Sequence, residues 1–274
     1  MKVFICADIE GVGCVVRSEH SSPSGRDYTM ARELMTGEVN AAVKGAFEGG
    51  ATEVMVADSH NVGLNLIPER LDNRVSLVMG GPRPLAMMEG IQRGFDRVFF
   101  IGAHAMAGTS NSSIVHIFHG RVAKVLFNNI SMGEIGINAA LAGYFGAPVA
   151  LVTGDNKACE EARALLSGVE IVEVKFGVGT YSAICLHPDR CRQLILEGAK
   201  KAMHNSDVGA YLFPEGLVVL EIGFTTASTV DRVLRMPGVE RLDELTVRYE
   251  GQNYMEAFKA FNTMVDLIEL VDFI

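Results

Sequence analysis

The sequence predicts an α/β protein in which a parallel-rich sheet carries helices on both faces, joined to a smaller α+β region. In the first half of the 274 residues, short β-rich runs alternate with helical stretches, which is typical of a parallel sheet with right-handed crossovers. The first run, Val3–Ile9, stays apolar almost to its end, as expected of a strand covered on both faces. From Val169 onward the order of elements becomes mixed. We therefore predict one domain over residues 1–165 and a smaller one over residues 166–274.

The spacing of apolar residues defines the elements of the first half. Between Tyr28 and Gly50 they recur at near-helical intervals until a glycine pair stops the pattern, which predicts a helix over this range. Runs rich in Val and Phe then predict further strands. These strands are Val54–Ala57, Val75–Met79 and Arg97–Gly102, with a helix at Leu85–Gln92 before the last of them.

The middle of the chain departs from this alternation. Two β-rich runs, Ile114–His119 and Val122–Asn128, flank Gly120-Arg121 and predict a hairpin or a pair of short strands. The remaining predicted elements are helices at Met132–Phe145, Asn156–Leu166, Asp189–His204 and Tyr254–Val271, and strands at Pro148–Thr153, Ile171–Phe176, Leu217–Ile222 and Thr246–Glu250. The last helix has an apolar stripe that we expect to pack into the core rather than to form an interface.

Composition excludes several classes of function. Net charge is −9 and no run of Lys or Arg is present, which argues against binding to nucleic acid or to an anionic membrane surface. The longest apolar stretch, Leu141–Val152, contains two glycines and a proline and is too short to span a bilayer. The N-terminus lacks the pattern of a signal peptide, and the five cysteines form no CxxC pair. We therefore expect a cytoplasmic protein in a reducing compartment.

Side chains that can bind metal follow three of the predicted strands. Asp8 and Glu10 end the first strand and share a face, so their charges repel each other unless a cation or protons intervene. The second strand ends in Asp58 and His60, and the fourth is followed by His104. Because ligands bind at the carboxyl edge of an open parallel sheet, this coincidence predicts a metal site there.

Each of these residues also has a purely structural explanation. An aspartate at a strand end is usually a turn or cap residue, and Asp58 is either a loop residue or a partner that orients a ligating imidazole. Glu134 fits a capping box that begins at Ser131, and its local sequence favours a cap over a ligand. His116 and His119 lie three apart on a predicted strand, so at most one of them can face the site.

The motifs together resemble the bacterial D-aminopeptidase (DppA) family of zinc metallopeptidases. The resemblance covers essentially the whole chain, and the motifs occur in the expected order. They are Asp8-Ile9-Glu10-Gly11, Asp58-Ser59-His60, the segment from Gly102 to Thr109, His116, and the segment from Asn129 to Gly136 with Asn138. One departure is Ile117, where this family often has a small hydroxyl residue; we expect its side chain to face away from the site.

The resemblance implies a dinuclear zinc aminopeptidase that acts on short peptides with an N-terminal D-amino acid such as D-Ala. It implies that His116 is the catalytic histidine, that Asp8 bridges the two metals, and that the protein forms ring-like homo-oligomers. The metal ligands that it implies are Asp8, Glu10, His60, His104 and Glu134.

The chemistry of this residue set leaves some alternatives open. Two imidazoles and three carboxylates suit Zn²⁺, and Mn²⁺ or Fe²⁺ would also accept them. Paired metals can lower the pKa of a water that they share, and His116 could act as acid, base or nucleophile. A dinuclear phosphoesterase or amidase, or a metal-stabilised peptide-binding protein without turnover, are the competing hypotheses. The sequence has no GxSxG motif and no phosphate-binding P-loop, so serine hydrolases and nucleotide hydrolases have no support.

Overall fold

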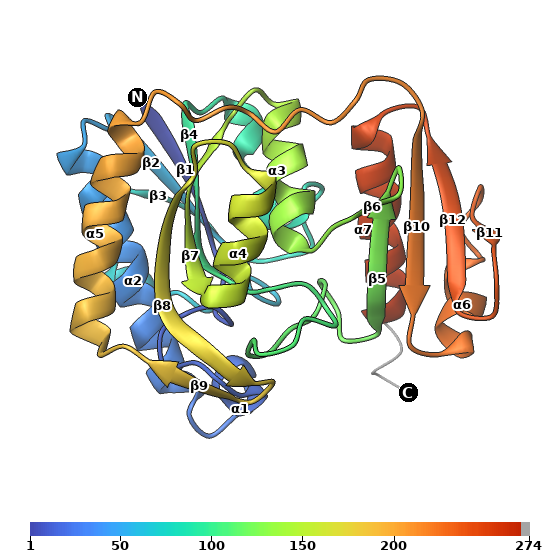
Figure 1. The fold of residues 1–274 in the computed structure, drawn as a ribbon, viewed down its shortest axis with the longest axis horizontal. Coiled ribbons are helices and arrows are strands. Elements are labelled where there is room, and N and C mark those ends of the chain that lie inside the picture. The colour runs from blue at the N-terminus through green and yellow to red at the C-terminus, as the bar shows by residue number, and fades with distance from the viewer. Residues whose placement is uncertain (270–274) are drawn as a thin grey trace.

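The structure, a computed structural model, describes residues 1–269 and contains two sheets (Figure 1). The first is seven-stranded, in the order β3-β2-β1-β4-β7-β8-β9. Its strands are β1 (Lys2–Ala7), β2 (Glu53–Asp58), β3 (Ser76–Val78), β4 (Arg97–Ala103), β7 (Val149–Asp155), β8 (Glu170–Gly179) and β9 (Ser182–Cys185). All neighbours are parallel except β8 and β9. The predicted parallel-rich sheet is confirmed.

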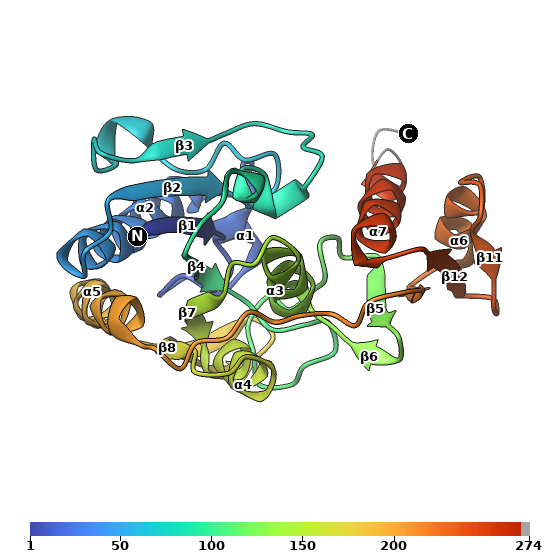
Figure 2. The same cartoon turned by 90° about the horizontal axis from the view of Figure 1, so that it is seen from above.

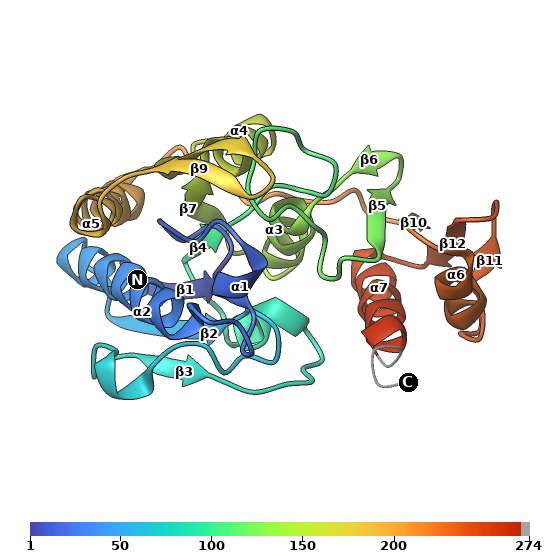
Figure 3. The same ribbon diagram turned by 90° about the horizontal axis from the view of Figure 1, so that it is seen from below.

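Helices cover both faces of this sheet, as predicted. On one face, α2 (Tyr28–Glu48) and α5 (Pro188–His204) bury a core that includes Val3 and Ile5 of β1. On the other face, α3 (Glu134–Tyr144) and α4 (Asn156–Leu165) bury Phe4 and Cys6. Successive residues of β1 therefore enter different cores, since strand side chains alternate between faces. Figure 3 shows these helix pairs on opposite sides of the sheet.

The second sheet is five-stranded and antiparallel, in the order β11-β12-β10-β5-β6. Its strands are β5 (Val122–Phe127), β6 (Ile130–Ser131), β10 (Val218–Phe224), β11 (Glu240–Arg241) and β12 (Thr246–Gly251). The helix α7 (Tyr254–Glu269) lies between this sheet and α3, and the short α6 (Ala227–Val233) packs beside it (Figure 2). Phe258, Phe261 and Met264 of α7 are fully buried, which confirms that its apolar stripe belongs to the core. The predicted end of this helix at Val271 lies outside the described residues.

The two sheets do not follow the order of the chain. After the predicted boundary at residue 165, β8, β9 and α5 still belong to the first sheet and its helices. Before that boundary, β5 and β6 already belong to the second sheet. The boundary therefore does not coincide with the division between the sheets, and the division of the chain into two domains stays a prediction.

Two predicted elements are wrong. The range Ile114–His119 is an irregular loop, because Ile114 and Phe118 adopt positive φ angles of 55° and 58° that a strand does not accommodate. The strand β5 pairs instead with β10 and β6. The predicted helix Leu85–Gln92 is replaced by two 3₁₀ turns, Ala86–Met88 and Ile91–Arg93. They are separated at Gly90, whose φ of 105° breaks a helix.

Two further features concern membrane-spanning helices and cysteines. No described helix is long and apolar enough to cross a membrane. All five cysteines carry free thiols, and Cys6, Cys159 and Cys191 are buried. The short helix α1 (Ser18–Ser21) follows the loop after β1 and contributes a backbone carbonyl to the site described next.

Candidate metal centre and active site

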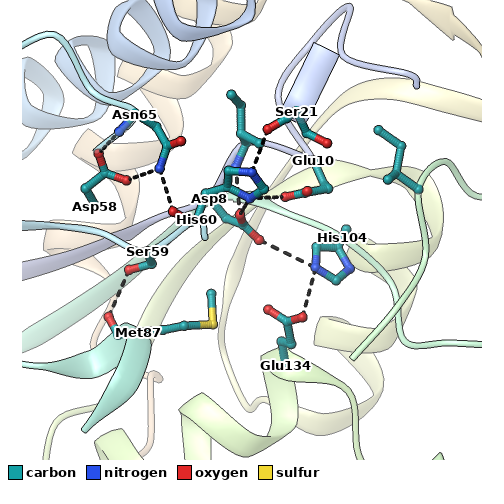
Figure 4. Close-up of polar contacts among 12 residues, drawn as sticks. Asp8, Glu10, Ser21, Asp58, Ser59, His60, Asn65, Met87, His104 and Glu134 are labelled. Atoms are coloured by element: carbon teal, nitrogen blue, oxygen red, sulfur yellow. Dashed lines mark hydrogen bonds and ion pairs between the residues drawn. The ribbon is translucent and has the colours of Figure 1, made fainter. Parts of the chain in front are cut away.

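Three adjacent strands bring the predicted ligands together. Because β2, β1 and β4 are parallel neighbours, their carboxyl ends lie at the same edge of the first sheet. Asp8 and Glu10 follow β1, His60 follows β2 and His104 follows β4. Glu134, the first residue of α3, meets them from the helix layer (Figure 4).

Asp8 lies at the centre of the cluster. Its Oδ1 is 3.3 Å from Nδ1 of His60, and its Oδ2 is 3.5 Å from Nε2 of His104. Nδ1 of His60 is also 3.0 Å from Oε2 of Glu10. The two oxygens of one carboxylate thus face imidazoles from two different strands, which is the geometry a bridging ligand needs.

Glu134 joins the cluster through its side chain instead of capping a helix. Its Oε1 lies 3.1 Å from Nε2 of His104 and accepts a 2.6 Å hydrogen bond from the backbone N–H of Phe118. The N-cap of α3 is Gly133, not Ser131, and the cap makes no side-chain hydrogen bond. The capping-box hypothesis for Glu134 is therefore wrong.

His116 lies beside the cluster, although it comes from a loop and not from a strand. Its ring stacks on that of His104, with centroids 4.1 Å apart, and its Nε2 is 3.7 Å from Oε1 of Glu134. Nδ1 of His116 is 3.0 Å from the carbonyl oxygen of Ile114. His119 is not among the residues that line the cleft, and Ile117 is buried in the core.

Asp58 has a structural role. Its carboxylate accepts hydrogen bonds from the backbone N–H groups of Asn65 and Leu66 and from the side-chain amide of Asn65. These bonds fix the loop that carries His60, whose backbone carbonyl accepts a further bond from Asn65. Asp58 makes no hydrogen bond to the imidazole itself: Nε2 of His60 is 2.8 Å from the carbonyl oxygen of Ser21, and Nδ1 faces Asp8 and Glu10.

The residues fit a metal centre on the evidence of their buried atoms. In His60 and His104, one ring nitrogen contacts a backbone carbonyl and the other faces carboxylates, which is the usual arrangement of metal-binding histidines. Within the described residues, Nε2 of His104 and Oε2 of Glu10 are buried and have no partner with hydrogen-bond geometry. Buried lone pairs that face one another require a cation or protons between them.

Burial and mutual charge shift the pKa values of the ionisable groups in the cluster. Burial, assisted by the charge of Glu10, raises the pKa of Asp8 to about 7. Burial would lower the pKa of His104, but the Glu134 carboxylate beside it raises that pKa to about 10. Burial and the neighbouring His104 lower the pKa of His116 below its usual value. In the protein alone, protonated imidazoles of His60 and His104 therefore supply most of the positive charge that balances the carboxylates of Asp8, Glu10 and Glu134.

Two triads of ligand-type atoms can be distinguished within this cluster. In each triad the atoms lie within 4.8 Å of one another, and the triads are Asp8-Glu10-His104 and His104-His116-Glu134. His60 adds a further nitrogen beside Asp8 and Glu10. The arrangement has enough donors of the types that zinc prefers for more than one ion.

A cleft of about 440 Å³ opens onto the cluster. Its walls include residues that no local motif indicated: Phe118, the loop from Gly80 to Arg83, and Asn262, Val265 and Asp266 of α7. A second, much smaller cavity of about 20 Å³ lies behind Asp8, His104 and Glu134 and is lined mainly by apolar side chains. No spacing rule could have indicated the α7 residues, because only the tertiary packing of α7 against α3 brings them to the site.

Comparisons with known proteins agree with the motif resemblance. A model of the D-aminopeptidase family matches residues 1–263. A curated D-aminopeptidase from Bacillus subtilis (strain 168) is 33% identical over 272 residues, which cover 97% of each chain. The solved structure of the Zn-dependent D-aminopeptidase DppA from Bacillus subtilis, described as a self-compartmentalizing protease, superposes with a TM-score of 0.95 at 32% identity and covers 98% of each chain.

Proposed function

The chain belongs to the D-aminopeptidase family, and we propose that it is a dinuclear zinc aminopeptidase for short peptides with an N-terminal D-amino acid of the D-Ala type. Family membership confirms the predicted assignment as a metallopeptidase. The observation that carries the dinuclear proposal is the position of Asp8, whose two carboxylate oxygens face His60 and His104 separately.

The proposed ligands divide around that carboxylate. Glu10 and His60 would hold one zinc together with Asp8, and His104 and Glu134 would hold the other. Bound there, the zinc pair would lower the pKa of water in the cleft, polarise the scissile carbonyl and attract the free amine of the substrate. The B. subtilis relative is Zn-dependent, which supports zinc over Mn²⁺ or Fe²⁺.

His116 is the proposed catalytic residue. The contact of its Nδ1 with the Ile114 carbonyl fixes the ring, and Nε2 lines the cleft near Glu134. A neutral imidazole in this position can accept a proton from the attacking water and return it to the leaving amine. The stacked ring of His104 holds His116 in place for both steps.

Further proposals concern assembly and location. The self-compartmentalizing character of the relative supports a ring-like homo-oligomer for this protein as well. The β8–β9 hairpin exposes Phe176, Val178, Tyr181 and Ile184, which supplies apolar surface that subunit contacts could cover. The free cysteines are compatible with the proposed cytoplasmic location.

Matched dipeptides test the activity. Purified, zinc-loaded protein is incubated with D-Ala-D-Ala and L-Ala-L-Ala, and release of free alanine is measured. The proposal expects cleavage of the D-peptide with a kcat/KM well above that for the L-peptide. Equal rates would contradict the stereochemical proposal, and cleavage of neither peptide would contradict the function. His104→Ala, which removes a proposed ligand, is the control for contaminating peptidase.

A further inference from the structure

Arg83 is the one lysine or arginine among the described residues that line the cleft. The same wall carries several carboxylates, namely Asp8, Asp58, Glu134 and Asp266. A single guanidinium in an otherwise acidic cleft is the position where an anionic group of a ligand would be attracted.

Within the described residues, the hydrogen bonding of Arg83 is incomplete. Its Nε donates to the carbonyl oxygen of Gly80, and this is the only hydrogen bond that its side chain makes. Nη2 is buried without a partner, and no ion pair joins Arg83 to a carboxylate. Asp58, the nearby acid, already accepts three hydrogen bonds from Asn65 and Leu66. Nη1, by contrast, is not buried and makes no hydrogen bond within the described residues, so it can donate to a ligand in the cleft.

The guanidinium is held in a defined position. It packs on Gly63, where an added Cβ would lie 2.0 Å from Nη2, so a side chain at this position would displace the guanidinium. The backbone N–H of Gly80 donates to the carbonyl oxygen of Gly63, which ties together the two loops that enclose the side chain. With Nε and Nη2 held in this way, Nη1 is the nitrogen that can donate a charge-assisted hydrogen bond to a carboxylate.

We propose that Arg83 binds the C-terminal carboxylate of the peptide substrate and so selects short peptides. The proposal rests on the aminopeptidase function above, which places the substrate's amine at the ligand cluster. In a dipeptide the free carboxylate lies one residue beyond the cleaved bond, an extended reach of roughly 3.5 Å. Arg83 lines the same cleft as Asp8, His60 and His116, so its charge faces the space that a peptide bound at the cluster would occupy.

The test compares D-Ala-D-Ala with its C-terminal amide, using zinc-loaded wild type and Arg83→Met. Wild type is expected to prefer the free acid by roughly 10- to 100-fold in kcat/KM, the range for a charge-assisted hydrogen bond. Arg83→Met should lose that preference through a raised KM on the acid, with little change on the amide. Arg83→Lys should keep part of the preference, because it keeps the charge but not the planar fork.

Controls separate recognition from folding. Arg93→Met removes an exposed arginine that does not line the cleft and should leave both substrates unaffected. Zinc content and thermal melting of each variant are measured alongside. Equal losses on acid and amide in Arg83→Met, or a wild type that cleaves both peptides equally well, would overturn the role of Arg83 while leaving the aminopeptidase function. Cleavage of neither peptide by wild type would overturn both.

Discussion

The rings of His104 and His116 are stacked, with centroids 4.1 Å apart and an angle of 15° between their planes. One ring faces Asp8 and Glu134, and the other lines the cleft. Two parallel imidazoles at this distance cannot both be positively charged without strong repulsion. We therefore expect His104, which faces the carboxylates, to bind metal, and His116, which lines the cleft, to transfer protons.

The first prediction concerns His116. His116→Ala should lower kcat by roughly 10²- to 10⁴-fold, the range for loss of general acid–base catalysis, while zinc content stays at the wild-type level. Steady-state kinetics with D-Ala-D-Ala and metal analysis of the same sample check this. His119→Gln is the matched control, because His119 lies near in sequence but does not line the cleft. Unchanged kcat in His116→Ala would remove it from the mechanism.

A second prediction concerns the division of ligands around Asp8. His60→Ala and His104→Ala should each weaken one of the two zinc sites, whereas Asp8→Ala should weaken both, since its oxygens face both imidazoles. Zinc per chain is measured after dialysis against a weak chelator. Asp266→Asn, which alters a cleft carboxylate on α7 that is not a proposed ligand, should retain the wild-type content. An Asp8→Ala protein that keeps a full complement of zinc would show that Asp8 is not the bridge.

A third prediction concerns Glu38 of α2, which is not a proposed metal ligand. Glu38 is buried, accepts a hydrogen bond from the backbone N–H of Gly13, and has one carboxylate oxygen without a partner within the described residues. Burial raises its pKa from 4.5 to about 7, although Lys175 and Arg192 act in the opposite direction. The titratable groups around it are Lys175, Arg192, Cys14 and Cys191.

Because its pKa is raised on folding, Glu38 makes the protein less stable as the pH rises. Well below pH 4.5 the carboxyl is protonated in both the folded and the unfolded chain, so its ionisation does not change the free energy of unfolding. As the pH rises to about 7, the unfolded chain ionises first, and stability falls by about 3 kcal/mol. Glu38→Gln should remove this loss, so its advantage over wild type in denaturant unfolding should grow from pH 5 to pH 8. A constant difference between the two proteins across this range would contradict the argument.

Much of the ligand cluster could be predicted from the sequence, because strand ends are local features. A run of apolar residues followed by Asp8 and Glu10, and similar endings at His60 and His104, is visible without any tertiary information. Parallel pairing then requires these endings to meet at one sheet edge, as the structure shows. Glu134 needed the family resemblance, because its local pattern is also that of a helix cap.

Other parts of the site depend on tertiary structure that no spacing rule encodes. The loop that carries His116 was predicted as a strand, since positive φ angles at Ile114 and Phe118 leave no signature in such β-rich residues. The wall formed by α7 arises from packing between elements that are far apart in the chain. Strand pairing is also decided by long-range contacts. For this reason β5, expected in the first region, joins the second sheet, and β8, expected in the second region, joins the first.

Titration of metal-free protein with zinc, while cleavage of D-Ala-D-Ala is followed, distinguishes the proposed two-metal centre bridged by Asp8 from a single-metal one. Activity should be absent without metal and should reach its plateau at about two zinc ions per chain. Direct metal analysis at the plateau should give the same ratio. Full activity at one zinc per chain, or in the metal-free protein, would contradict the two-metal centre.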